Sequence, residues 1–394
     1  MKKTLIALAA VASLATSGAA FAQATISGQL GFSWQQSPVI KDIKDGSHPQ
    51  GLSMNDGDIY LTAKEDLGGG MSATARGGFT MRGRGTAIAD RDGTISLAGP
   101  MGSVTVGNLR SCGPLDAVKS GAVTGTVYTA NETENAVPLD KCSLVDVVTY
   151  TAPKFGDFTL AATYGEFNNA AGTNQKGNVT GLTFTVLGAT YASGPFMATG
   201  DVTTYAAATS ANQSSGLKAL DGWMRTRAAG TYDMGAAKFG LGYQTWTWGK
   251  ADQMLASVAI PVQNMVFGID YMARGAQGAA TKGSAADNEA FESVANTLGS
   301  TRNGDAASSA VGVGVTYNFS KTVSLNASYI TYTDVGVNSK YGTPVAAAAQ
   351  VMNNAAVGVA PTVKTAAVAA NPFPAGTTPA AFDTEYRVRL LKTF

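Results

Sequence analysis

The feature that most constrains this chain is an alternation of apolar and polar residues with a period of two, repeated along its length. In residues 24–35, Ile26, Leu30 and Phe32 share one parity, whereas Gln29 and Ser33 share the other. The same alternation returns in residues 58–64, 71–82, 239–243, 267–274, 311–319 and 323–329. Such a period puts apolar side chains on one face of a β-strand and polar ones on the other. The chain is therefore expected to be all-β.

The polar faces of these strands favour a water-filled interior over a packed core. They include Arg76, Arg82, Arg225 and Arg227. A closed apolar core would not accept such charges, whereas a water-filled lumen would. Aromatic residues gather near strand ends, at Tyr164, Phe167, Tyr317 and Phe319. Because aromatic girdles flank the apolar band of transmembrane barrels, the pattern indicates a barrel that faces lipid outside and water inside.

The connections between the expected strands alternate in length. Short ones occupy residues 66–70, 98–102, 153–157, 193–196, 233–236, 261–264 and 319–321. Long ones occupy residues 36–55, 109–144, 167–179, 207–221, 275–307 and 334–381. Short periplasmic turns and long external loops are the layout of antiparallel outer-membrane barrels. The spacing predicts about sixteen strands, with the weakest patterns at 91–97 and 253–260, and a last strand ending at Phe394 that pairs with the first.

Residues 1–22 have the pattern of a secretory signal peptide, and residues 23–394 are expected to form the barrel. Lys2 and Lys3 precede a short apolar run, and Ala20 and Ala22 fit a small-x-small cleavage site. Subtracting these two lysines from the formal charge of +1 leaves −1 for residues 23–394. A nearly neutral chain gives no support for nucleic-acid binding, which needs a basic face.

The residue inventory argues against an enzyme, a metal site and a bound cofactor. His48 is the chain's one histidine, so neither a Ser–His–acid triad nor a histidine-rich zinc site can be assembled. The glycine-rich stretches do not open a helix, which a phosphate-binding loop requires. No catalytic, metal or cofactor site is therefore expected.

Several segments resemble, in order, those of Gram-negative general porins. "EDLGGGMSATARGGF" is similar to an acidic turn and the strand after it in that family, and "DRDGTISLAGPMGSVTVGN" resembles the hairpin before their constriction loop. "VTYTAPKFGDFTLAATY" and "LGATYASGP" fit later strands, and the terminal Phe394 fits the family's barrel-assembly signal. The resemblance covers nearly all of residues 23–394 and is nearest to porins of the beta-proteobacterial type.

The resemblance implies a homotrimer of sixteen-stranded barrels in the outer membrane, in contact with its lipid and lipopolysaccharide. Small hydrophilic solutes and ions would diffuse through each barrel, and the third external loop, about 109–144, would fold into the lumen as a constriction. Asn108 stands where these porins often have arginine, and Thr149–Thr151 stand where they often have Arg-Tyr-Asp. These departures argue against strong anion selectivity.

Charged residues of this loop are expected to face basic residues of the wall, because opposed charges set the barrier that a solute meets. The candidate pore and constriction residues are Arg76, Arg82, Arg110, Asp116, Lys119, Glu132, Glu134, Asp140, Arg225, Arg227, Arg274, Arg387 and Arg389. Lys64 and Lys141 are further basic residues of the wall and the loop. Arg76, Arg82 and Asp116 are favoured because they lie on or beside the loop's own strands. In the alternative interpretation, several of these residues lie at the pore mouths and only keep the lumen hydrated.

Cys112 and Cys142, the chain's two cysteines, flank this loop. Export to an oxidising compartment favours a disulfide between them, and two free thiols are the alternative. Closing a loop of about 30 residues would restrict the unfolded chain by about 3–4 kcal/mol in the chain-entropy model.

The sequence as a whole predicts a passive pore in the outer membrane. Two alternatives stay open. One is a substrate-specific channel of the same fold. The other is an outer-membrane adhesin or receptor that uses the long segments 275–307 and 334–381.

Overall fold

The computed structural model describes residues 23–36, 50–81, 89–111, 114–124, 143–168, 179–207, 221–247, 252–275, 308–333 and 384–394. The first eight strands are β1 (Gln23–Gln36), β2 (Gln50–Gly68), β3 (Met71–Thr80), β4 (Ala89–Gly99), β5 (Gly102–Ser111), β6 (Ser143–Thr151), β7 (Phe158–Asn168) and β8 (Val179–Ser193). The next eight are β9 (Phe196–Ala207), β10 (Met224–Asp233), β11 (Lys238–Trp246), β12 (Gln253–Val262), β13 (Met265–Arg274), β14 (Ser308–Asn318), β15 (Val323–Thr333) and β16 (Thr384–Thr393). A short 3-10 helix, η1 (Pro114–Val118), follows β5.

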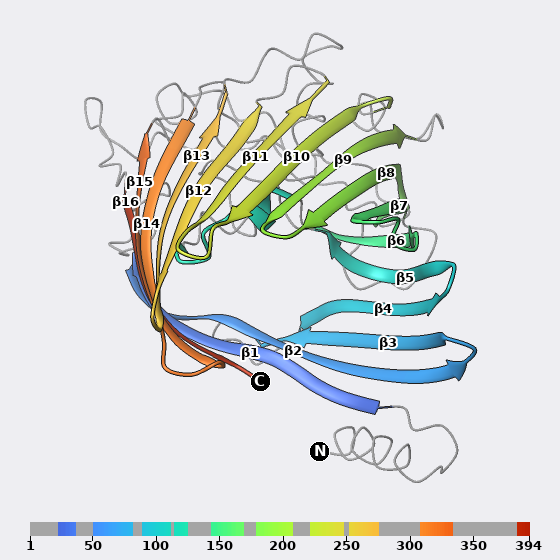
Figure 1. The fold of residues 1–394 in the computed structure, drawn as a ribbon, viewed down its shortest axis with the longest axis horizontal. Coiled ribbons are helices and arrows are strands. Elements are labelled where there is room, and N and C mark those ends of the chain that lie inside the picture. Colours follow the sequence, from blue (N-terminus) through green and yellow to red (C-terminus); the bar gives the residue numbers. More distant parts are fainter. Residues whose placement is uncertain are drawn as a thin grey trace, which may run out of the picture.

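These strands form one closed antiparallel barrel, in which each strand pairs with its neighbours in sequence and β1 pairs with β16 (Figure 1). The expected all-β barrel of about sixteen strands is thus confirmed. The terminal residue takes part in the closure, because the amide of Gly28 donates to the Phe394 carbonyl and the amide of Phe394 donates to the Gly28 carbonyl. Among the described residues, no helix has the length and apolar character needed to cross a membrane.

Both segments with weak patterns, 91–97 and 253–260, lie inside strands, in β4 and β12. The predicted first long connection, 36–55, is wrong at its end because β2 already begins at Gln50. A register shift opposite Gly31 and Phe32 leaves Asn55 without a partner on β1. One extra residue exchanges the inner and outer faces of a strand. The alternation in residues 50–54 is therefore out of phase with that after Asn55, and the start of β2 is missed.

Side chains alternate across the wall as the pattern predicts. On β10, Arg225, Arg227 and Ala229 are buried inside, whereas Met224 is exposed outside. Large apolar side chains cover the outer face, for example Leu187 and Leu241. Exposed aromatic residues lie toward the long-loop ends of strands at Trp34, Tyr164, Tyr243, Tyr271 and Tyr329, and toward the short-turn ends at Phe158, Phe196, Phe239, Phe267 and Phe319. The outer face is therefore built for a lipid bilayer.

A cluster of buried apolar residues lies on the inner side of the wall. It joins Leu115, Val118 and Val123, from the segment after β5, to residues of β10 and β12–β15. The barrel thus encloses a small packed core along part of its wall.

Candidate pore and constriction

Residues 114–124, called here the constriction segment, leave the wall after β5 and run along the inner face of distant strands. The helix η1 at its start contacts β10, β11 and β12. Figure 1 shows this segment in teal inside the barrel, behind β10 and β11. The strand count places it in the third external loop, the position expected for the constriction.

Apolar contacts hold one side of the constriction segment to the wall. Leu115 is fully buried, and Val118 and Val123 are nearly so. They pack with Ala229, Leu255, Met272, Ala310 and Ile330, which all point into the barrel. Burying one leucine or valine side chain contributes about 1.5–3 kcal/mol, so this contact is a substantial part of what fixes the segment.

Polar side chains of the wall bind the backbone of the same segment. The amide of Ser120 donates to Asp270 Oδ1 on β13 at 3.0 Å, and Asn326 Nδ2 on β15 donates to the Ala122 carbonyl at 2.7 Å. The hydroxyl of Ser257 on β12 donates to the Val118 carbonyl. A segment without regular structure needs such partners for its buried backbone groups.

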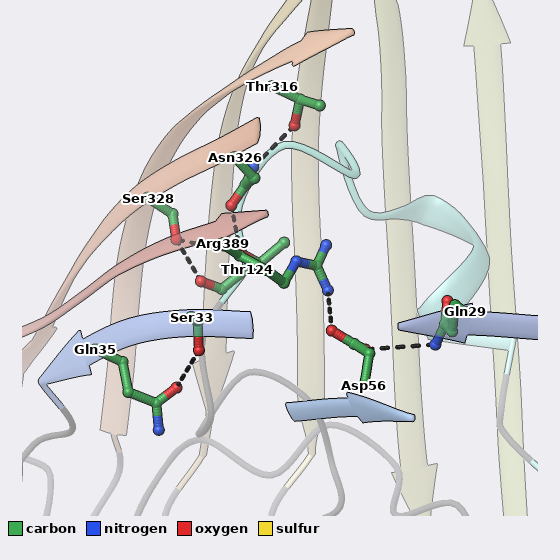
Figure 2. A network of polar contacts seen from close by, with 9 residues as sticks. All are labelled: Gln29, Ser33, Gln35, Asp56, Thr124, Thr316, Asn326, Ser328 and Arg389. Atoms are coloured by element: carbon green, nitrogen blue, oxygen red, sulfur yellow. Dashed lines mark hydrogen bonds and ion pairs between the residues drawn. The ribbon is translucent and has the colours of Figure 1, made fainter. Parts of the chain in front are cut away.

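Thr124 ends the described part of the segment in a polar network on β14 and β15. Its hydroxyl donates to Asn326 Oδ1, and Ser328 donates to its carbonyl. Asn326 Nδ2 also reaches the Thr316 hydroxyl at 2.8 Å (Figure 2). With these groups bonded, Asn326 is 2% exposed, which is tolerable for an amide because its hydrogen-bonding groups are satisfied.

The wall beneath the constriction segment lacks side chains at the points of closest approach. A Cβ atom at Gly240 or Gly314 would collide with the Val118 or Ala122 carbonyl. At Gly268 a Cβ would lie 2.7 Å from the Ala122 Cβ and 2.8 Å from the Ser120 Cβ. These distances are far below the roughly 3.5–4.0 Å of normal carbon contacts, so glycine is required there for the segment to lie flat on the wall.

Two arginines of the inner wall are paired with aspartates. Arg227 Nε on β10 lies 2.9 Å and 3.0 Å from the two carboxylate oxygens of Asp201 on β9. Arg389 Nη1 on β16 lies 3.2 Å from Asp56 Oδ2 on β2. These pairs neutralise charge that would otherwise face the lumen.

The Arg389–Asp56 pair crosses the strand at which the barrel closes. Figure 2 shows Arg389 and Gln29 approaching Asp56 from opposite sides, with Gln29 Nε2 at 3.4 Å from Asp56 Oδ1. A Cβ atom at Gly31 on β1 would lie 2.5 Å from Asp56 Oδ2. Glycine at that position therefore leaves the space through which the Arg389 side chain reaches Asp56.

Two other arginines stack on aromatic rings. The Arg76 guanidinium on β3 lies 3.8 Å from the centre of the Tyr60 ring on β2. The Arg225 guanidinium lies 5.1 Å from the Trp246 ring, and its Nη2 is 3.4 Å from the Thr203 hydroxyl. Cation–π contact holds a guanidinium in one orientation but leaves its charge in place.

The structure separates the predicted site residues into three groups. Arg76, Lys119, Arg225, Arg227, Arg387 and Arg389 are described with their side chains. Arg110, Asp116 and Arg274 are described by their backbones alone, in β5, η1 and β13. Arg82, Glu132, Glu134, Asp140, Cys112 and Cys142 lie outside the described residues, as does residue range 1–22. Within the first group, Arg225, Arg227 and Arg387 are buried, whereas Arg76 and Arg389 are partly exposed.

Sequence reasoning missed the partners of the predicted residues. Asp56, Asp201 and Asp270 were not among the candidates, and neither were Ser257 and Asn326. All five occupy the polar parity of their strands, so parity alone could have placed them on the inner face. Neither parity nor composition, however, tells which inner residues lie under the constriction segment. In the described part of the chain, no group of histidine, cysteine and acidic residues is arranged to hold a metal ion.

Comparison with known proteins agrees with this architecture. A family model described as Gram-negative porin matches residues 7–337. A mutant of the Rh. blastica porin aligns with a TM-score of 0.55 and 11% identity, covering 94% of this chain and 100% of the other. The trimer form of OmpT, an outer membrane protein of Vibrio cholerae, aligns with a TM-score of 0.54 and 13% identity, covering 94% and 99%. At such identities the solved structures support the fold alone, and a comparison with curated proteins finds no match.

The family match extends over most of the chain. A porin is expected to have the barrel, the lipid-facing outer surface and the polar inner wall that the structure shows. The family and the fold point to a channel. The chain belongs to the Gram-negative porin family and forms a channel in the outer membrane.

Proposed function

We propose that the chain is a passive diffusion channel for small hydrophilic solutes and ions, with a bore set by the constriction segment. The observation that carries this proposal is the attachment of the segment to the inner wall. Side chains of β12, β13 and β15 bind its backbone, and apolar side chains pack beneath it. A narrowing held in this way keeps one width, which is what a size-selective diffusion pore requires.

The charges of the wall support a weak preference between anions and cations. Arg227 and Arg389 each lie in an ion pair, which cancels most of their field at the distance of a passing ion. Arg76 contacts the Tyr60 ring instead, and its positive charge acts on the lumen. The expected channel is mildly anion-selective, with the partly exposed Arg76 as a contributing charge.

Planar-bilayer recording of the purified protein tests both the diffusion channel and its ion preference. Stepwise conductance that is linear with voltage is expected, and the reversal potential in a salt gradient should indicate a slight anion preference. Arg76→Gln should move the reversal potential toward cations, whereas the neutral pair Arg227→Gln with Asp201→Asn should leave it nearly unchanged. Absence of conductance would contradict the channel, and equal shifts in the two variants would contradict the role of Arg76.

The outer face supports assembly into a homotrimer. Among the exposed apolar side chains described on β2–β5, all are aliphatic, such as Leu61, Ile95 and Leu97, and none is aromatic. Tyrosine and tryptophan mark the positions where a barrel meets the lipid head groups, so their absence from one sector favours contact with protein. We expect this sector to face the other subunits, and the rest of the apolar band to face lipid and lipopolysaccharide.

Thiol cross-linking distinguishes the two kinds of surface. Leu97→Cys lies in the aliphatic sector and Leu241→Cys lies on β11, at 55% and 62% exposure in the parent chain. A short thiol cross-linker should join subunits through residue 97 and not through residue 241. Cross-linking through residue 241 alone would place the interface on the opposite sector.

A substrate-specific channel is the alternative that these recordings would detect, because a preferred solute would block the current saturably. The adhesin or receptor alternative depends on segments 275–307 and 334–381, which lie outside the described residues apart from Gly275. We infer no catalytic activity for the chain.

A further inference from the structure

The inner wall opposite the constriction segment has an unusual composition. Thr74, Ser96, Thr105, Thr149 and Thr163 stand directly opposite one another on β3, β4, β5, β6 and β7. These five residues are called here the hydroxyl row. They share the inner parity of their strands, since neighbours such as Ile95, Val104 and Leu160 are exposed on the outer face. Each residue of the row is partly exposed.

The hydroxyls of the row are linked but not saturated. Ser96 and Thr105 lie 2.8 Å apart, and Thr149 and Thr163 lie 2.9 Å apart, measured between hydroxyl oxygens. A hydroxyl group has one donor and two acceptor sites, so each linked pair uses one donor and one acceptor. Every pair therefore keeps a donor and several acceptors for water or a solute.

The row extends along the direction of transport. Neighbouring strands lie about 4.8 Å apart, so four spacings span roughly 19 Å of wall. Because strands of such barrels tilt by about 40°, a row perpendicular to them climbs roughly 12 Å along the pore axis. A solute could thus exchange one hydroxyl partner for the next over a large part of the channel.

The constriction segment faces this row across the lumen. The segment covers the inner face of β10–β15, whereas the row occupies β3–β7, and the two groups are centred about half a circuit apart in the closed order of strands. The row lies near the short-turn ends of its strands, as Thr74 does in a strand that begins at Met71, whereas the segment spans the wall from Gly268, near the short-turn end of β13, to Met272, near its long-loop end. Solutes that pass the segment must pass along the row.

We propose that the hydroxyl row is a transient binding surface for neutral, polyhydroxylated solutes, the class of small sugars and polyols. This inference rests on the proposed diffusion channel and names the solutes that it favours. A neutral solute gains no net Coulombic energy from the wall's charges, and it loses hydrogen bonds to water when it enters a narrow passage. The row replaces those bonds with donors and acceptors of equal chemistry, which lowers the barrier for solutes that carry hydroxyl groups.

Flux of sorbitol through the full-length protein in liposomes, divided by its potassium chloride conductance in bilayers, tests the proposal. Thr105→Val with Thr149→Val removes two hydroxyls of the row at nearly constant volume. Thr185→Val with Thr204→Val is the matched control, because these two residues stand directly opposite each other on β8 and β9 with exposed side chains on the outer face. Thr105→Ser with Thr149→Ser keeps the hydroxyls and loses only methyl groups.

The normalised sorbitol flux should fall roughly two- to tenfold in the valine variant of the row, about the effect of one net hydrogen bond. It should stay near the parent value in the control and in the serine variant. Normal conductance with equal sorbitol flux in all variants would overturn the hydroxyl row and leave the channel intact. A loss in the serine variant equal to that in the valine variant would also overturn it. A parent protein without conductance would refute the proposed function itself.

Discussion

Replacing Gly268 by alanine adds one methyl group beneath the constriction segment and tests how that segment sets the bore. In the parent structure the added Cβ would lie 2.7 Å from the Ala122 Cβ and 2.8 Å from the Ser120 Cβ, and it would also collide with the Ser120 hydroxyl. Carbon atoms need about 3.5 Å or more, so the segment must retreat from the wall by roughly 1 Å. The wall itself cannot yield easily, because β13 is paired on both sides.

A retreat from the wall is a movement into the lumen. It also stretches the bond between the Ser120 amide and Asp270 Oδ1, which is 3.0 Å long in the parent. Overpacking of this kind costs about 1–3 kcal/mol of stability. The cost weakens the attachment of the segment and leaves the strand pairing of the barrel intact. We therefore expect Gly268→Ala to fold into a normal barrel with a narrower passage and a less firmly held constriction segment.

Single-channel recording gives the test, and Gly188→Ala provides the control. Gly188 lies on β8, where an added Cβ would meet its nearest neighbours, the Asp201 Cβ and the Gly200 carbonyl, at an ordinary 3.6 Å. Gly268→Ala should lower the unit conductance and the size limit for neutral solutes, whereas Gly188→Ala should change neither. If both variants conduct like the parent, the constriction segment does not set the bore. If Gly268→Ala conducts more, the segment is displaced along the wall and not into the lumen.

Two further predictions concern the inner wall, and a third concerns the two cysteines. Asn326→Ala removes the donor to the Ala122 carbonyl, which should cost about 1–3 kcal/mol of attachment and raise the open-channel current noise relative to Asn264→Ala in the β12–β13 turn. Arg389→Gln should lower the melting temperature of the barrel by leaving Asp56 without its ion-pair partner, and Arg389→Gln with Asp56→Asn should recover most of the loss; equal melting of single and double variants would contradict the coupling. Non-reducing peptide mapping should recover one disulfide-linked pair that joins Cys112 to Cys142, and alkylation of both thiols without a reductant would exclude it.

The fold could be predicted because a membrane strand carries its own signal. Each strand alternates between lipid and water, so residues such as Leu241 and Gln244 report their faces without knowledge of the rest of the chain. The alternation even places Arg225, Arg227, Arg387 and Arg389 correctly on the inner face. It fails where the register shifts, as at Asn55. One extra residue exchanges the two faces of the strand, so the alternation on one side of it does not continue on the other.

The constriction could be predicted in position but not in its contacts. The strand count assigns the segment after β5 to the lumen, yet nothing local relates Leu115 to Leu255 or Ala122 to Asn326, which lie far apart in sequence. A buried leucine on β12 breaks the rule that inner residues are polar, and only the segment lying over it explains why. Apolar residues at inner positions, including Met272 and Ile330, mark in the sequence the part of the wall that the segment covers.

The charges of the pore show why a residue-by-residue prediction overstates selectivity. Arginines attract notice in a chain in which only 14% of residues are charged, and the candidate set accordingly contained seven wall arginines and no wall acid. Yet Arg227 pairs with Asp201 on the adjacent strand, and Arg389 reaches Asp56 only because Gly31 leaves the intervening strand bare. The second pair depends on a glycine of β1, the strand that lies between the two partners. Its existence therefore follows from barrel closure and from no local motif. What a passing ion meets is the charge left after such pairing, and the partly exposed Arg76, beside the neutral hydroxyl row, is one such charge on the described wall.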